Sequence, residues 1–218
     1  SPKVQPAMLA SLRVVVAGAE KLDESVREGF AQKFDKAIYE GYGATETAPV
    51  AAVNLPDAVG VHYQQVQKGN KPGTVGMPLP GTCFRIVDPD TMAELPLGED
   101  GLIMISGNQV MLGYLNDPEL TAAAVVEIDG RRWYKTGDKG HITPEGFLEI
   151  IDRYSRFAKL GGEMISLGAV EEFVARHLDS EKVDAAAVCK PHDIKGEQII
   201  LLVAGEIDAS TLRGELVR

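Results

Sequence analysis

The sequence has few cysteines and no long apolar run, and each shortage excludes a class of protein. Its two cysteines, Cys83 and Cys189, lie far apart and form neither a CxxC pair nor a disulfide framework. Both lie in apolar stretches, which predicts buried structural thiols in a reducing compartment. No segment reaches the roughly 18 apolar residues of a membrane span, and no signal-peptide pattern opens the chain. The sequence predicts a cytoplasmic location for this stretch, without excluding a membrane-associated parent protein.

Basic residues are also scarce. The chain has 22 Lys and Arg against 32 Asp and Glu, which gives a net charge of -10. This excess argues against nucleic acid and anionic membrane as main partners. The length of 218 residues and the hydrophobic content of 44% are enough for one large domain or one and a half ordinary ones.

The first part of the chain has an α/β pattern. Residues 12–17 form a continuous apolar run, typical of a buried parallel strand. Residues 23–34 carry an apolar helical face with Asp23 placed as N-cap, and residues 37–40 read as a second strand. Such a crossover unit makes the two strands parallel. The segments that follow them, 18–20 and 41–47, should therefore share the sheet edge where ligands of open α/β folds bind.

Short β segments separated by turn signals fill residues 72–152, which predicts a distorted barrel or sheet. Beyond them the sequence predicts a hairpin turning at Gly161-Gly162, an amphipathic helix at 168–178 and two more strands.

The expected fold is α/β with a β-rich, distorted-barrel subdomain and a small C-terminal α+β domain. We place the large portion at 1–152, with an α/β part at 1–71 and a β-rich part at 72–152, and the small domain at 153–218. The first strand starts almost at once, and "DASTLRGELVR" opens like a helix without a C-terminal signal. These ends predict a fragment of a larger protein.

The stretch "GYGATET" carries the residue types that bind a nucleotide. Gly41 and Gly43 would let backbone approach a ligand closely, and Tyr42 offers a flat face to a base. Thr45 offers a hydroxyl to a phosphate oxygen, and Glu46 is a hard oxygen ligand for Mg²⁺. The alternative is a glycine-rich turn with incidental polar residues.

Two further stretches are candidates. Asp138 in "YKTGDKG" can accept hydrogen bonds from a ribose diol, or it can belong to an ordinary turn. Arg153, Arg156 and Lys159 follow at three-residue spacing, which is more often a solvated face. The histidines show no metal-ligand spacing and are expected to be surface or packing residues: His62, His141, His177 and His192.

The order of these stretches resembles a known family. "YEGYGATET", "GTVGMPLPG", "ISGNQVMLGYLNDPELT", "WYKTGDKG" and "DRYSRFAKLGGEMISLGAVEE" are similar to the second half of the acyl-adenylate-forming superfamily. "LRVVVAGAEKL" and the last stretch look most like the acyl-ACP synthetase part of bifunctional 2-acylglycerophosphoethanolamine acyltransferases. The resemblance implies a ligase that uses ATP and Mg²⁺ to convert a fatty acid into acyl-AMP. The acyl group then passes to the phosphopantetheine thiol of acyl carrier protein or of CoA.

The resemblance also implies roles for single residues. Nucleotide binding would involve Gly18, Ala19, Glu20, Gly41, Tyr42, Gly43, Asp138 and Arg153. The first three and Tyr42 would shape the adenine pocket, while Asp138 and Arg153 would hold the ribose. Thr45 would bond the α-phosphate, Glu46 would hold Mg²⁺, and Lys159 would move inward for the second step.

The sequence also departs from the family pattern. The lysine-bearing loop for the β- and γ-phosphates, the catalytic C-terminal lysine and the HxxxxD acyltransferase motif have no match here. Ser155 stands where the family often has Asp or Lys at a domain hinge. A generic acyl-CoA ligase and a nucleotide-binding module without catalysis therefore stay open as alternatives, and the fragment alone is expected to be inactive.

Overall fold

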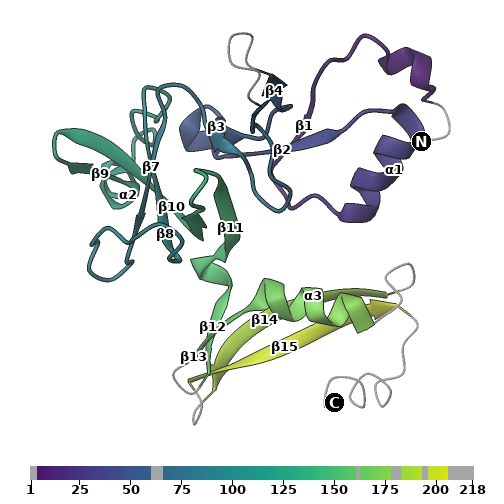
Figure 1. Cartoon of the computed structure of the whole chain (residues 1–218). Helices are drawn as coiled ribbons and strands as arrows, with labels where there is room; N and C mark the ends of the chain where they lie inside the picture. The colour runs from purple at the N-terminus through teal and green to yellow at the C-terminus, as the bar shows by residue number, and fades with distance from the viewer. Residues whose placement is uncertain (1–3, 60–65, 161–162, 178–182, 193–195, 206–218) are drawn as a thin grey trace. The chain divides into compact units, whose positions relative to one another are not determined.

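The structure, a computed structural model, describes residues 4–59, 66–160, 163–177, 183–192 and 196–205. Its internal contacts divide the chain into two compact units, Ser1–Ile151 and Asp152–Arg218. Each unit has its own sheets (Figure 1). Each also has its own hydrophobic cluster.

The first unit begins with a mixed sheet in the order β1-β2-β3-β6. Its strands are β1 (Val15–Ala17), β2 (Ile38–Gly43), β3 (Val50–Val53) and β6 (Met77–Pro78). β1 and β2 run parallel and are joined through α1 (Glu24–Phe34), as the crossover pattern predicts, while the other pairs are antiparallel.

Helix α1 begins directly after its capping residue, Asp23. The Asp23 side chain accepts hydrogen bonds from the backbone N–H groups of Ser25 and Val26, which otherwise lack partners in the first turn. The helix ends at Asp35, whose φ of 51° is left-handed. Arg27 ties the helix to the sheet through an ion pair with Glu40, a β2 residue that is only 9% exposed.

The second sheet supplies the β-rich part, with strand order β11-β10-β8-β7 and β9 paired to β10. Its elements are β7 (Cys83–Val87), β8 (Gly101–Ser106), α2 (Pro118–Ala124), β9 (Val125–Ile128), β10 (Arg131–Ile142) and β11 (Leu148–Arg153). Every residue of β8 is buried, as expected of a central strand covered on both faces. Ile103, Ile105 and Tyr134 anchor the core of this unit, against which Tyr42 of the first sheet also packs.

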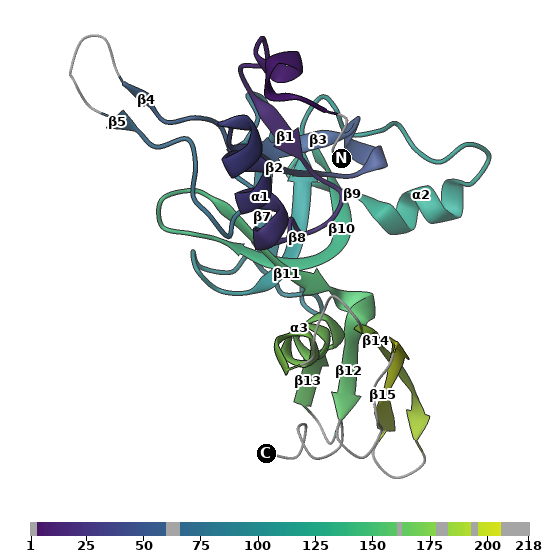
Figure 2. The same cartoon turned by 90° about the vertical axis from the view of Figure 1, so that its right-hand side faces the viewer.

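Shorter elements complete the first unit. They are the 3-10 helices η1 (Pro6–Leu9) and η2 (Thr45–Thr47) and the two-stranded β4 (Ala58–Val59) and β5 (Val66–Gln67), which project as a separate ribbon in Figure 2.

The second unit is a four-stranded antiparallel sheet with one helix. Its elements are η3 (Tyr154–Arg156), β12 (Phe157–Leu160), β13 (Glu163–Ser166), α3 (Leu167–His177), β14 (Val183–His192) and β15 (Gly196–Gly205). The strand order is β13-β12-β15-β14, and α3 packs along one face of the sheet (Figures 1 and 2). The register Leu160↔Glu163 confirms the predicted hairpin.

Asp152 begins the second unit by capping its helix. Its Oδ2 accepts hydrogen bonds from the Ser166 hydroxyl, at 2.5 Å, and from the Gly168 N–H, at 3.1 Å. An acidic side chain at the first turn of α3 satisfies a free backbone donor and opposes the positive end of the helix dipole. Asp152 is thereby bonded to α3 and belongs to the second unit, whereas the sequence placed the start of that unit one residue later, at Arg153.

Several local predictions were wrong. The strand predicted at 12–17 is only Val15–Ala17, and none of it is fully buried: Val16 is 49% exposed, because β1 is the edge strand of its described sheet. The strand predicted at 37–40 runs on to Gly43, because β3 pairs with the glycine segment and extends the ladder. Cys83 and Cys189 are half-buried free thiols rather than buried ones. The helix predicted at the C-terminus lies outside the described residues.

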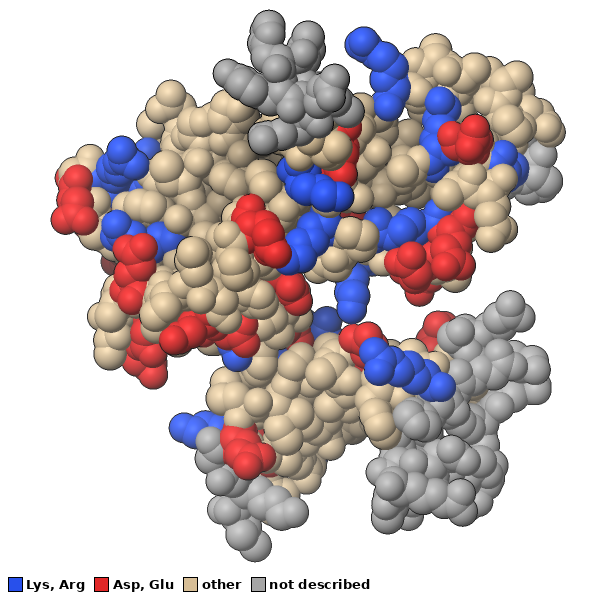
Figure 3. Space-filling view, in the orientation of Figure 1, with Lys and Arg blue, Asp and Glu red and all other residues tan. Residues whose placement is uncertain are grey.

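Surface charge and helix length bear on the expected partners. Figure 3 shows Lys and Arg side chains interspersed with Asp and Glu on the face drawn, with no large basic area among the described residues. In that same part of the chain, no helix has both the length and the apolar character needed to cross a membrane.

Candidate active site

The parallel pairing brings two candidate segments together at one edge of the first sheet. Ala17 pairs with Glu40, so the residues after β1 lie beside the second half of β2. A Cβ placed on Gly18 would lie 2.9 Å from the carbonyl oxygen of Gly41, which only glycine allows. The next residue, Ala19, has a φ of 78°, a conformation that costs energy for a residue with a side chain. Gly18, Ala19 and Glu20 are all exposed.

The glycines of "GYG" have structural reasons of their own. They belong to β2 and not to a loop after it. A Cβ at Gly43 would lie 1.8 Å from the carbonyl oxygen of Pro49, and one at Gly41 would lie 3.3 Å from that of Ala52. The backbone of the returning chain therefore occupies the space beside Gly43 that the sequence analysis left to a ligand.

The "TET" segment is a single turn of 3-10 helix, η2, held by its last residue. The buried Thr47 hydroxyl accepts a hydrogen bond from the Ala44 N–H at 3.0 Å and contacts the Pro49 carbonyl oxygen at 2.9 Å. Sequence reasoning gave Thr47 no role, yet it fixes the turn that carries the two candidate residues. Thr45 is exposed on this turn and Glu46 is half-buried.

Glu46 is held by a tyrosine from a distant loop. The Tyr114 hydroxyl donates a hydrogen bond of 2.7 Å to Glu46 Oε1. The Met111 N–H, three residues earlier in the same loop, donates to the Glu46 carbonyl oxygen at 2.8 Å. The carboxylate hydrogen bond is the main cause that raises the pKa of Tyr114 to about 12. The phenol therefore stays protonated, and remains a donor, at neutral pH.

Asp138 is held in the same way by Tyr42. The Tyr42 hydroxyl donates to Asp138 Oδ2, and the Asp138 N–H donates to the Thr136 hydroxyl at 3.0 Å. Asp138 is 8% exposed and lies where the β10–β8 register shifts, beside Gly137 with a φ of 77°. Burial, followed by the charge of Asp138, raises the pKa of Tyr42 above its ordinary value.

A third tyrosine connects the two carboxylates. Burial is the main cause that raises the pKa of Tyr134, and the charges of both Glu46 and Asp138 raise it further. Tyr134 belongs to the core of the first unit and is 7% exposed. The two candidate acidic residues thus lie around one shared phenol, that of Tyr134.

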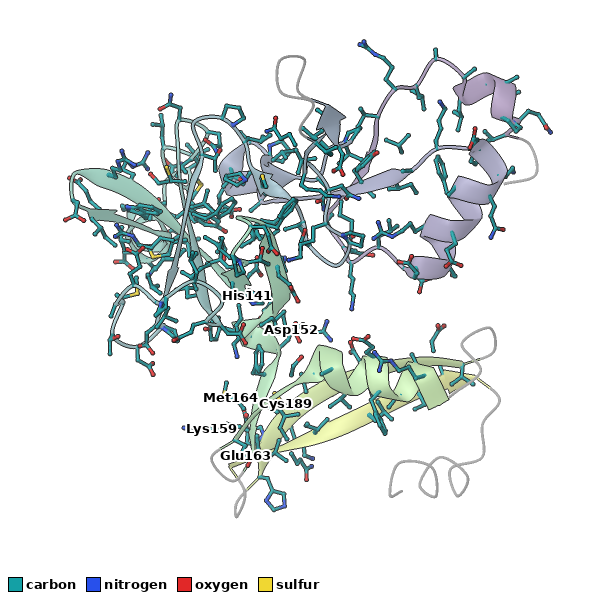
Figure 4. All side chains as sticks on the ribbon, viewed as in Figure 1. His141, Asp152, Lys159, Glu163, Met164 and Cys189 are labelled. Atoms are coloured by element: carbon teal, nitrogen blue, oxygen red, sulfur yellow. The ribbon has the colours of Figure 1, made fainter. Side chains whose placement is uncertain are left out.

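Arg153 and Lys159 belong to the second unit, and both side chains are exposed. The Lys159 N–H donates to the Glu197 carboxylate, whose other oxygen is 3.9 Å from Cys189 Sγ. Figure 4 shows Lys159, Met164 and Cys189 at the same end of this sheet. Arg156 is not free for a ligand, because it forms an ion pair with Glu171 at 2.5 Å.

His141, labelled in Figure 4, is a packing residue as expected: its Nδ1 is 2.9 Å from Asp100 and its Nε2 is 3.6 Å from Glu149. Among the described residues, no group of three or more His, Cys, Asp or Glu could hold a metal ion. Of the two carboxylates in the candidate site, Glu46 is the one assigned to a metal. This donor set fits Mg²⁺, which proteins commonly bind through one or two carboxylates together with substrate phosphates.

Sequence reasoning missed Tyr114 and Tyr134, although both lie inside motifs that it had singled out, "GYLNDPELT" and "WYKTGD". The presence of a tyrosine in each motif was a signal that the residue could act in the site. Which carboxylate each tyrosine contacts depends on the tertiary structure.

A strained loop, a hydroxyl-bearing turn and two phenol-held carboxylates thus lie near the sheet edge at which open α/β folds bind their ligands. Residues 1–115 match the family described as AMP-binding enzyme, and the chain belongs to this family. A 4-coumarate–CoA ligase of Pinus taeda is 32% identical over 211 residues, which are 96% of this chain and 37% of the relative. The chain thus spans a little over a third of the length of the curated relatives it matches.

Solved structures agree with this family. The ATP-bound structure of MatB from Rhodopseudomonas palustris is 28% identical with a TM-score of 0.80, covering 100% of this chain and 41% of that one. The amide bond synthetase McbA from Marinactinospora thermotolerans is 28% identical with a TM-score of 0.71, covering 95% and 40%. These matches confirm the predicted α/β fold with its curled β-rich part, and they confirm that the chain is a fragment of an adenylate-forming enzyme.

Proposed function

We propose that the parent protein of this chain is an AMP-forming acid–thiol ligase. In the first step, a carboxylate oxygen of the acid attacks the α-phosphorus of ATP, and pyrophosphate leaves to give acyl-AMP. In the second, a thiolate attacks the acyl carbonyl carbon and AMP leaves, which yields a thioester. One observation carries the proposal: Glu46 and Asp138, which the two steps need at the phosphates and at the ribose, are held in one tyrosine cluster.

The nucleoside would be recognised at the β1–β2 edge. Gly18, Ala19 and Glu20 are exposed beside β2 and would line the adenine together with Tyr42. Asp138 has a second carboxylate oxygen beyond the one that Tyr42 bonds, and it would accept hydrogen bonds from the ribose hydroxyls. The role of Arg153 at the ribose stays a prediction from the family resemblance.

The phosphates would lie beside η2. Thr45 is exposed there and would donate its hydroxyl to an α-phosphate oxygen. Glu46 would hold Mg²⁺ through its carboxylate, which the Tyr114 hydroxyl orients by a hydrogen bond to Oε1. When bound, Mg²⁺ would neutralise phosphate charge as pyrophosphate departs.

The second step would use the β12–β13 hairpin. Lys159 is exposed on β12 opposite Met164 and is available to a phosphate or to an incoming phosphopantetheine group. The hairpin is tied to β14 and β15 through Glu197, so the hairpin and its sheet would move as one body.

Two pairs of substrates compete for this site. The stretches "LRVVVAGAEKL" and "DRYSRFAKLGGEMISLGAVEE" favour a fatty acid and acyl carrier protein, because the finer resemblance rests on them. The matched relatives named 4-coumarate–CoA ligase favour an aromatic acid and CoA for this chain.

A parallel assay of the full-length protein separates these pairs. Pyrophosphate release is measured with a fatty-acid series and with 4-coumarate, and thioester formation is measured with holo acyl carrier protein and with CoA. We expect release with the fatty acids and transfer to the carrier protein. Release with 4-coumarate and transfer to CoA alone would select the second pair. If neither acid gives release although ATP binds, the ligase proposal is wrong and a binding module remains.

A further inference from the structure

Tyr114 reaches Glu46 from outside every segment assigned to substrate binding. It lies between β8 and α2, and its hydroxyl is 2.7 Å from Glu46 Oε1 across a sequence separation of 68. The proposed reaction assigns Tyr114 no step. Its hydroxyl instead contacts the one carboxylate to which we assign a metal.

The loop that carries Tyr114 is anchored on three sides. The Tyr114 N–H donates to the Thr121 hydroxyl at 2.8 Å, which ties it to α2. Arg132 of β10 donates from one Nη2 to the carbonyl oxygens of Met111 and Leu112, at 2.8 and 2.9 Å. With the Met111–Glu46 backbone bond, these contacts set the phenol at a fixed place relative to η2.

A phenol is suited to orient a metal-binding carboxylate without competing for it. A protonated tyrosine donates one hydrogen bond to a carboxylate, which has about four lone-pair sites and therefore keeps the capacity to bind a cation. It adds no charge of its own, so it does not repel Mg²⁺ or neutralise the carboxylate. Hydrogen bonds of this kind to metal ligands fix their orientation, and losing one typically weakens metal affinity about 10- to 100-fold.

We propose that Tyr114 is a positioning residue that holds the Glu46 carboxylate in the orientation that binds the Mg²⁺ brought by ATP; this inference rests on the proposed function above.

The test measures metal-dependent nucleotide binding in the full-length protein, apart from turnover. ATP binding is followed by calorimetry over a Mg²⁺ series, and Mn²⁺ binding in the presence of ATP is followed by electron paramagnetic resonance. For Tyr114→Phe we expect the Mg²⁺ concentration for half-maximal ATP binding to rise about tenfold, near the lower end of the usual loss. ATP affinity without metal should stay as in the wild type, because the base and ribose contacts are intact.

Three further variants make the result specific. Tyr39→Phe makes the same chemical change in β2 at a hydroxyl with no hydrogen bond among the described residues, and it should leave the Mg²⁺ series unchanged. Thr121→Val frees the Tyr114 backbone with the phenol intact, and it should shift the Mg²⁺ series in the same direction by about threefold. Tyr114→Phe combined with Glu46→Gln should be no weaker in Mg²⁺ than Glu46→Gln alone, because positioning acts through that carboxylate.

The outcomes separate this inference from the proposed function. If Glu46→Gln weakens the Mg²⁺ dependence while Tyr114→Phe and Thr121→Val do not, the positioning role is wrong and the metal role of Glu46 stands. If Glu46→Gln also leaves the Mg²⁺ series unchanged, Glu46 is not the metal ligand and the proposed function loses that assignment together with the inference. If Tyr114→Phe raises the required Mg²⁺ concentration tenfold in the wild type and equally in the Glu46→Gln background, its effect does not act through Glu46, and the positioning role is also wrong.

Discussion

The Tyr42 hydroxyl donates a hydrogen bond to the Asp138 carboxylate across 96 positions of sequence. This bond joins the first sheet, with its candidate adenine edge, to the strand that carries the candidate ribose residue. Asp138 is 8% exposed, so the tyrosine compensates a carboxylate that is largely removed from water.

Tyr42→Phe should therefore weaken both stability and nucleotide binding. Removing one partner of a buried charged group costs about 1–3 kcal/mol. We expect a lower unfolding midpoint for the full-length protein and a higher KM for ATP, measured by thermal denaturation and by pyrophosphate release. Tyr39→Phe serves as the matched control on the same strand. An unchanged midpoint and KM would show that the bond contributes nothing.

Glu46→Gln should slow the adenylation step of the full-length protein about 10²- to 10³-fold, because one electrostatic contact at the transferring phosphate is lost. The measurement is ATP–pyrophosphate exchange at saturating acid. Glu94→Gln, which removes an exposed carboxylate paired to Arg85, is the control and should be near wild type. Exchange at the wild-type rate in Glu46→Gln would contradict a metal role for this residue.

The 218-residue chain alone should form no acyl-AMP. Cationic groups must neutralise the charge that develops on the β- and γ-phosphates, and the family's lysine-bearing loop has no match in this sequence. The check is pyrophosphate release from ATP and acid by the purified chain beside the full-length protein. Release by the chain at a comparable rate would mean that it holds a complete phosphate site.

The Lys71–Glu145 ion pair should make stability depend on pH in the acidic range. Its 2.8 Å hydrogen bond is the main cause that lowers the pKa of Glu145 from 4.5 to about 2. A lowered pKa gives stability that is complete above 4.5 and is lost as the pH falls toward 2. The gap in unfolding midpoint between wild type and Glu145→Gln should narrow across that window. A gap that stays constant with pH would rule out this linkage.

Ser155→Pro in the full-length protein should spare acyl-AMP formation and slow thioester formation. Ser155 is exposed in η3, at the position where the family often has a domain-hinge residue. We expect the chain to turn there between the adenylation step and the thioester step. Proline fixes φ near -65°, which would trap one hinge state. Pyrophosphate exchange and thioester yield are measured side by side. Equal loss of both would indicate a folding defect and would exclude the hinge.

Local signals made much of the fold predictable. Helix α1 begins after Asp23 because an aspartate caps free N–H groups within its own turn, and β12 pairs with β13 in the order that the hairpin pattern predicts. Prediction failed where pairing and burial depend on other parts of the fold. Strand β2 runs on to Gly43 because β3 pairs with it and extends the ladder. Val16 of β1 was expected to be buried and is exposed.

The sequence by itself determined the order of the elements, the crossover that puts two chain segments at one sheet edge, and the identity of Thr45, Glu46 and Asp138 as candidates. Only the tertiary structure decided which side chains hold those carboxylates. Tyr114 and Tyr42 reach Glu46 and Asp138 across 68 and 96 residues. Such pairs depend on strand register and loop anchoring, to which spacing along the chain gives no guide, because the contacts form only when separate sheets pack together.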